Sequence, residues 1–157
     1  MEESETPAQR STRNFNELLQ ELRVAQAGVQ ILFAFLLAVA FTEQYREGTT
    51  YVHAIHMVTV LFTTIAAAFL IAPAVWHRVL FQQGRRIHIL ALGTKFALIG
   101  MASLAAAMTG TVLLISEVVI GGWIALTLAG MTAVMFVSLW FVLPHWLHRD
   151  EEPEAST

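Results

Sequence analysis

The sequence predicts an all-α, polytopic membrane protein, with four transmembrane helices in an up-down-up-down bundle preceded by an N-terminal amphipathic helical extension. Two observations predict this fold. Hydrophobic residues make up 56% of the 157 residues and charged residues only 13%, whereas soluble domains carry about 25% charged residues. The apolar residues fall in four long blocks separated by charged residues. A soluble enzyme domain is therefore excluded.

Each of the four blocks is long enough to cross a bilayer, which takes roughly 20 apolar residues. The predicted spans run over about residues 24–41, 52–75, 96–118 and 123–147. Short connections join the first pair and the last pair, and the last connection ends in the turn-forming pair Gly121 and Gly122. The middle connection, 76–94, is longer. We expect one membrane domain, 14–149, between a disordered acidic N-tail, 1–13, and a disordered acidic C-tail, 150–157.

The segment before the first span has the pattern of an amphipathic helix. Asn14 followed by Glu17 resembles a capping box, which supplies partners to the first amides of a helix. Apolar side chains then recur at helical spacing, and polar ones occupy the other faces. We expect this segment to lie on or near the cytoplasmic surface before the chain enters the membrane.

The distribution of Lys and Arg predicts the orientation, because cytoplasmic loops carry an excess of these residues. Of the nine, all but Arg46 fall in or beside the N-tail, the middle connection and the C-tail. Both termini and the middle connection are therefore expected in the cytoplasm.

The middle of each predicted span lacks a carboxylate, although an ion-coupled carrier would need a titratable group there. Hydroxyl groups such as those of Thr63, Ser103 and Thr127 occur there instead, and these usually bond to their own helix. The chain has no cysteine, so thiol chemistry is excluded. Its net charge of −3 offers no basic face to nucleic acid. We expect no enzymatic activity, no catalytic residue, no bound metal and no cofactor.

A polar cluster is predicted at the cytoplasmic side. Gln26 and Gln30 are four residues apart, and both amides should turn toward another helix or a cavity. The predicted cluster comprises Arg23, Gln26, Gln30, His77, Arg78 and Lys95. Hydrogen bonds between helices together with positive-inside charge are one interpretation of this cluster. A pocket for an anionic lipid headgroup or a partner is the other.

A smaller cluster is predicted at the outer side. His53 and His56 share a face of the second predicted helix, and Glu117 could approach them. Interfacial hydrogen bonding, a metal or proton site, and a partner contact are the alternatives. Small residues also line faces of three helices: Ala34 and Ala38; Ala102, Ala106 and Gly110; and Ala125, Ala129 and Ala133. These stripes fit packing within one bundle or dimerisation.

Residues 14–30, NFNELLQELRVAQAGVQ, and the following LFAFLL at 32–37 resemble a family of small uncharacterised bacterial four-helix membrane proteins. The pair Ala72-Pro73 followed by His77, Arg78 and Phe81 is similar to that family's second-helix ending. The resemblance covers about residues 14–147. Members are sometimes named sodium:proton antiporters, and the resemblance brings no set of catalytic residues. It implies a multi-pass protein of the bacterial cytoplasmic (inner) membrane and draws attention to these cytoplasmic-side residues: Leu22, Arg23, Gln26, Gly28, Gln30, Pro73, His77 and Arg78.

The resulting functional expectation is a non-enzymatic integral membrane protein that acts as an accessory or a scaffold. Its expected partners are membrane lipids, including anionic headgroups on the cytoplasmic side, and either a second copy in a homodimer or an unknown membrane protein. No nucleic acid is expected. The alternative is a small cation:proton antiporter-like transporter that acts as an oligomer.

Overall fold

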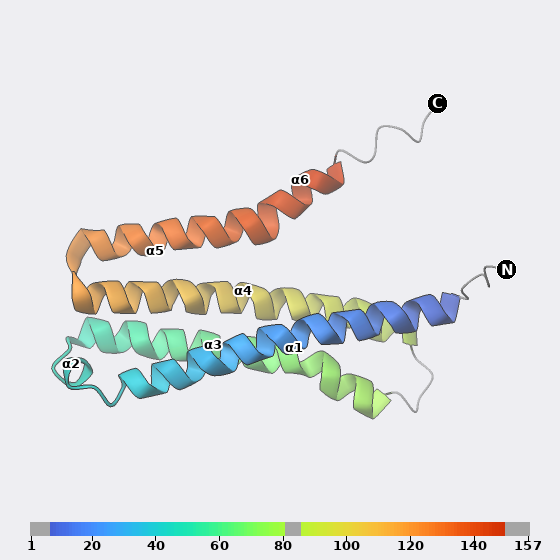
Figure 1. Ribbon diagram of the computed structural model, residues 1–157, viewed down its shortest axis with the longest axis horizontal. Coiled ribbons are helices and arrows are strands. Elements are labelled where there is room, and N and C mark those ends of the chain that lie inside the picture. Colours follow the sequence, from blue (N-terminus) through green and yellow to red (C-terminus); the bar gives the residue numbers. More distant parts are fainter. Residues whose placement is uncertain (1–6, 81–85, 150–157) are drawn as a thin grey trace. The chain divides into compact units, whose positions relative to one another are not determined.

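The computed structural model describes residues 7–80 and 86–149, without the side chains of 77–80, 86–91, 147–149 and several positions before residue 19. All regular structure in this part of the chain is helical (Figure 1). The elements are α1 (Pro7–Val39), α2 (Glu43–Arg46), α3 (Thr50–Leu80), α4 (Arg86–Val119), α5 (Gly122–Val137), the π-helical turn η2 (Ser138–Val142) and α6 (Leu143–Arg149).

Four stretches of helix are long and apolar enough to cross a membrane. They are Leu19–Val39, Thr50–Trp76, Leu92–Val119 and Gly122–Trp146. Their bounds lie within five residues of the predicted spans, so the all-α class and the four apolar helices are confirmed. The up-down-up-down order and the position of the N-terminal extension at the membrane surface stay predictions.

The first helix begins earlier than the sequence pattern indicates. α1 starts at Pro7, a residue that suits the first helical turn because it has no N–H to leave unpaired. Asn14 is therefore an exposed residue inside α1. Glu17 forms an ion pair with Arg13, with 3.7 Å between Glu17 Oε1 and Arg13 Nε. The predicted capping box is wrong, and residues 7–13 belong to a helix rather than to a disordered tail. Residues 1–6 and 150–157 lie outside the described residues.

The connection between the second and third spans is shorter than predicted. α3 continues to Leu80 and α4 begins at Arg86, so the flanks of the predicted 76–94 connection are helical. Both flanks mix apolar and polar residues, and each extends an existing helix. Propagation of a formed helix is favourable even where nucleation would fail.

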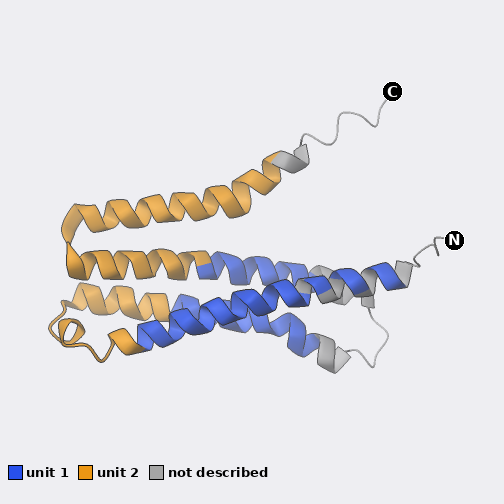
Figure 2. Ribbon diagram, in the orientation of Figure 1, with its two compact units in different colours: residues 1–37, 61–104 blue, residues 38–60, 105–157 orange. Residues whose placement is uncertain are grey.

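The chain divides into two compact units, which Figure 2 shows in different colours. Unit 1 comprises residues 1–37 and 61–104, and unit 2 comprises residues 38–60 and 105–157. Unit 1 thus holds most of α1, the second part of α3 and the first part of α4. Unit 2 holds the remaining parts of these helices together with α2, α5, η2 and α6.

The core of unit 1 combines apolar and small side chains from three helices. Its buried residues include Leu22 and Val29 from α1, Ala66 and Leu70 from α3, and Ala97 from α4. Aromatic rings adjoin this core. The Phe96 ring of α4 lies 5.2 Å from that of Phe69 and 4.8 Å from that of Trp76, measured between centroids.

The core of unit 2 joins α3 to α4 through a close contact. Gly110 of α4 lies against Thr59 of α3, so a methyl group at position 110 would overlap the Thr59 hydroxyl. That hydroxyl donates a 2.7 Å hydrogen bond to the Ile55 carbonyl of its own helix. From α5, only Ala125 and Ala129 are buried. The predicted small-residue stripes therefore contribute to packing within the chain at these three positions.

A tight glycine turn joins α4 to α5. The backbone N–H groups of Ile120 and Gly121 both donate to the Ser116 carbonyl, at 2.9 and 3.0 Å. Gly121 and Gly122 adopt φ angles of 74° and 66°, which residues with a Cβ rarely adopt. The predicted turn is confirmed.

Two prolines near helix ends are accommodated differently. Pro73 is buried inside α3. Pro144 is exposed and lies two residues after the π-helical turn Ser138–Val142, which is closed by a hydrogen bond from the Leu143 N–H to the Ser138 carbonyl. A proline removes one backbone donor and crowds the preceding turn, so each site needs a compensating feature.

Candidate functional site

A side-chain hydrogen bond ties α1 to α3 within unit 1. The Gln26 amide Nε2 donates to the backbone carbonyl of Leu70 at 2.9 Å, and Gln26 is half-buried. Because Pro73 has no N–H, the Phe69 carbonyl loses its usual donor four residues on, and the Pro73 ring crowds the turn that contains Leu70. The Gln26 amide thus supplies a donor to this disturbed turn from a neighbouring helix.

The same turn of α3 is contacted from α4. A Cβ added at Gly100 would lie 2.8 Å from the Leu70 side chain and 3.2 Å from the Leu70 backbone nitrogen. The absence of a side chain at Gly100 therefore lets α4 approach the α3 backbone. Leu70 is fully buried and is contacted by Gln26 and Gly100, so three helices of unit 1 converge on one residue. We call Gln26, Leu70, Pro73 and Gly100 the Leu70 junction.

The other predicted cytoplasmic-side residues are arranged differently. Gln30 is exposed, and its amide makes no hydrogen bond to a residue that the structure describes. Arg23 and Lys95 are also exposed. The side chains of His77 and Arg78 lie outside the described residues. The expectation that both glutamines turn inward therefore holds for Gln26 and not for Gln30.

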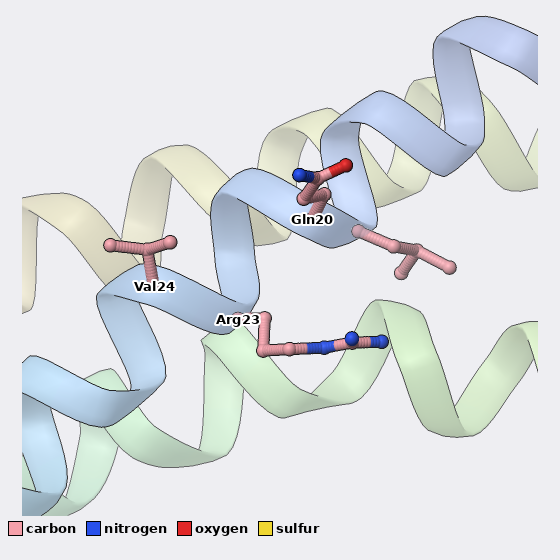
Figure 3. Close-up of a pocket in the computed structure, with 4 residues that line it drawn as sticks. Gln20, Arg23 and Val24 are labelled. Atoms are coloured by element: carbon pink, nitrogen blue, oxygen red, sulfur yellow. The ribbon is translucent and has the colours of Figure 1, made fainter.

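A shallow hollow lies beside α1 at Leu19, Gln20, Arg23 and Val24. Figure 3 shows Arg23 extended from α1 with its guanidinium directed toward the N-terminal part of the helix. Arg23 is four residues inside the Leu19–Val39 span, close enough for a long side chain to reach the end of the span. Apolar side chains beside a cation offer both an acyl-chain surface and a headgroup contact.

At the predicted outer end, unit 2 places both histidines around Tyr45. The His53 Nε2–H donates to the Tyr45 backbone carbonyl at 2.8 Å, and His56 Nδ1 and the Tyr45 hydroxyl share a hydrogen bond of 3.0 Å. Both imidazoles meet the Tyr45 ring edge to face, with centroids 4.6 and 4.7 Å away. His56 is buried. The pair therefore anchors the segment containing α2 to the start of α3.

The structure offers no three-ligand metal site at these histidines. Among the residues it describes, no group of three His, Cys, Asp or Glu side chains could hold a metal ion. Glu117 is half-buried in the last turn of α4. The hydrogen bonds of His53 and His56 to Tyr45 favour interfacial hydrogen bonding among the three interpretations of the outer cluster.

One family model matches the chain over residues 4–144, and its description is family of unknown function, DUF6328. The chain belongs to this family. DUF6328 membership agrees with the resemblance to an uncharacterised family and carries no activity with it. No curated protein and no solved structure matches this DUF6328 chain.

Sequence reasoning missed the two residues at which the sites are centred. For these sites, the sequence patterns singled out neither Leu70 nor Tyr45, on which the contacts converge. Pro73 was the available signal for the first, because a proline inside a span marks a disturbed turn to which a neighbouring helix can contribute a donor. No comparable signal points to Tyr45, whose backbone carbonyl and hydroxyl are both used.

Proposed function

We propose that the protein is a non-enzymatic, multi-pass accessory or scaffold protein of the bacterial cytoplasmic membrane. The observation that carries the proposal is the hydrogen bond that the Gln26 amide donates to the Leu70 backbone carbonyl of its own chain. A site for a charged substrate in a membrane needs ionisable groups near the middle of the spans. Here the amide that enters the helix packing serves the packing itself.

The placement of charge supports the same proposal. The charged residues within the four spans are Glu21, Arg23, Lys95 and Glu117, each within four residues of a span end. Thr111 and Thr127 lie further in, and each bonds the carbonyl four residues before it. These groups provide no relay for a proton across the membrane.

The proposed orientation has both termini in the cytoplasm, as the Lys and Arg distribution indicates. Because the chain has no cysteine, single substitutions can be labelled without background. Gln9→Cys should resist a membrane-impermeant maleimide in intact cells, and Thr49→Cys should react. Reversed labelling of the two variants would overturn the orientation.

The functional proposal is tested in proteoliposomes of purified protein with a pH-sensitive dye inside. A sodium or potassium pulse outside should give the same dye response as in empty vesicles. A response that requires the protein and depends on the cation would establish the antiporter instead. A known antiporter reconstituted in parallel shows that the assay works.

An accessory or scaffold role also requires a partner. The tagged protein, cross-linked in native membranes, should recover one membrane protein reproducibly. The comparison is a double variant, Arg23→Gln with Gln20→Leu, which replaces two exposed side chains of α1. Recovery of nothing beyond lipid from both forms would count against the role.

A further inference from the structure

The middle of the first span exposes a polar group. Gln30 lies 11 residues from Leu19 and 9 residues from Val39, the ends of that span. At 1.5 Å per residue, roughly 13 Å of helix separates Gln30 from the nearer end and roughly 16 Å from the farther one. A glutamine side chain is much shorter than this distance, so the amide cannot reach water along the helix. An amide without a partner in hydrocarbon costs several kcal/mol, so a partner from outside the monomer is favoured.

The residues around Gln30 form a regular seam on the exposed side of α1. Ala27, Gln30, Ala34 and Leu37 follow one another at steps of three, four and three residues, and all four are exposed. This is the spacing of the seam along which two helices pack in a left-handed pair. The alanines one turn to either side of Gln30 allow two backbones to approach closely. We call these four residues the Gln30 seam.

We propose that the Gln30 seam binds the same seam of a second copy of this chain, in a parallel pair with Gln30 against Gln30. The amide carries both a donor and an acceptor, so two amides related by a two-fold axis exchange two hydrogen bonds. A second copy inserted in the same orientation presents its amide at the same depth.

This inference does not rest on the proposed function. Arg23 continues the seam toward the N-terminus, four residues before Ala27, and lies near the end of the span. Its guanidinium extends toward that end (Figure 3), where water and headgroups screen the repulsion between two arginines. The contact is therefore centred on Gln30 and looser at Arg23.

Single cysteines test the seam, since the natural chain contains none. Ala34→Cys lies on the seam, and Phe35→Cys lies on the next residue, about 100° around the helix. In native membranes treated with an oxidant, Ala34→Cys should form a disulfide-linked dimer and Phe35→Cys should not. Equal cross-linking of the two variants, or none from Ala34→Cys, would overturn the proposal.

The role of the amide is tested in the Ala34→Cys background. Gln30→Leu should lower the cross-linked fraction by about fivefold, and Gln30→Asn should keep most of it because the amide remains. Unchanged cross-linking in Gln30→Leu would overturn the role of Gln30. The comparison of Ala34→Cys with Phe35→Cys keeps the natural glutamine, so it stands even if a Gln30 variant fails to fold.

Discussion

The side-chain amide of Gln26 donates a 2.9 Å hydrogen bond to the backbone carbonyl of Leu70, three residues before Pro73. The two residues are 44 positions apart in the chain, and the bond links α1 to α3. A proline in a membrane helix is tolerated where neighbouring groups satisfy the backbone that it disturbs. In unit 1, Pro73 deprives the Phe69 carbonyl of its donor, and the Gln26 amide of another helix bonds the next carbonyl of the same turn, that of Leu70.

Gln26→Leu should therefore destabilise the protein by about 1 kcal/mol, the usual size of a hydrogen bond between membrane helices. The measurement is reversible unfolding in mixed micelles. Gln20→Leu, an exposed change on the same helix, is the control and should leave the stability unchanged.

The link to Pro73 gives this prediction a second, stricter form. Pro73→Ala returns a donor to the Phe69 carbonyl and removes the ring that crowds the turn containing Leu70, so Gln26→Leu should cost less in this relaxed turn than in the natural chain. A double-mutant cycle measures this coupling. Strict additivity of the two substitutions would show that the Gln26 bond is unrelated to the proline.

Gly100→Ala should destabilise unit 1 by about 1–3 kcal/mol. The new methyl group would overlap the Leu70 side chain and lie close to the Leu70 backbone nitrogen. Gly28→Ala is the matched control, since a Cβ at Gly28 has nothing within 4 Å and alanine favours helix. The expected order of thermal stability is Gly28→Ala at or above the natural chain, with Gly100→Ala below it. Equal melting temperatures for the two alanine variants would contradict the close approach at Leu70.

Tyr45→Phe should loosen the outer loop without unfolding unit 2. It removes the hydroxyl that pairs with His56 but leaves the backbone carbonyl that accepts from His53. A lost hydrogen bond of this kind is worth about 1 kcal/mol. Amide hydrogen exchange should accelerate over residues 42–48, whereas Tyr51→Phe, which changes an exposed ring, should have no effect. Identical exchange in both variants would mean that the hydroxyl does not anchor the loop.

Arg23→Gln should reduce the binding of anionic phospholipid beside α1. One basic side chain near an anionic membrane surface contributes about 1 kcal/mol, which corresponds to roughly a fivefold change in affinity. The measurement is lipid retention in nanodiscs that contain both anionic and zwitterionic phospholipids. Arg46→Gln, at the predicted outer end, is the control, and an equal loss in both variants would count against a specific contact at Arg23.

Much of the fold could be predicted from the sequence, because span length and apolar content depend on the bilayer rather than on tertiary detail. The four spans agree with the structure to within five residues. The start of α1 could not be predicted from Asn14 and Glu17, because a capping pattern inside a helix looks the same as one at its beginning. The glycines at 121 and 122 indicated a turn, and the structure gives both of them positive φ angles, which residues with a Cβ rarely adopt.

The site was only partly predictable. Periodicity put Gln26 and Gln30 on neighbouring positions of one face, and the two differ by 40° around the helix. That small rotation places one amide against Leu70 and leaves the other exposed. Which of the two turns inward depends on where α3 packs, and the sequence of α1 does not contain that information.

The π-helical turn at Ser138–Val142 holds one residue more than an α-helical turn of the same kind would. Each residue of an α-helix corresponds to a rotation of about 100°, so the positions from Leu143 onward are out of phase with the face of Ala125 and Ala129. A single-residue deletion within the turn would bring the two segments back into phase and swing Trp146 to a different side of the helix. An insertion or deletion within the turn therefore rotates α6 about its own axis, whereas a substitution leaves the number of residues in the turn unchanged.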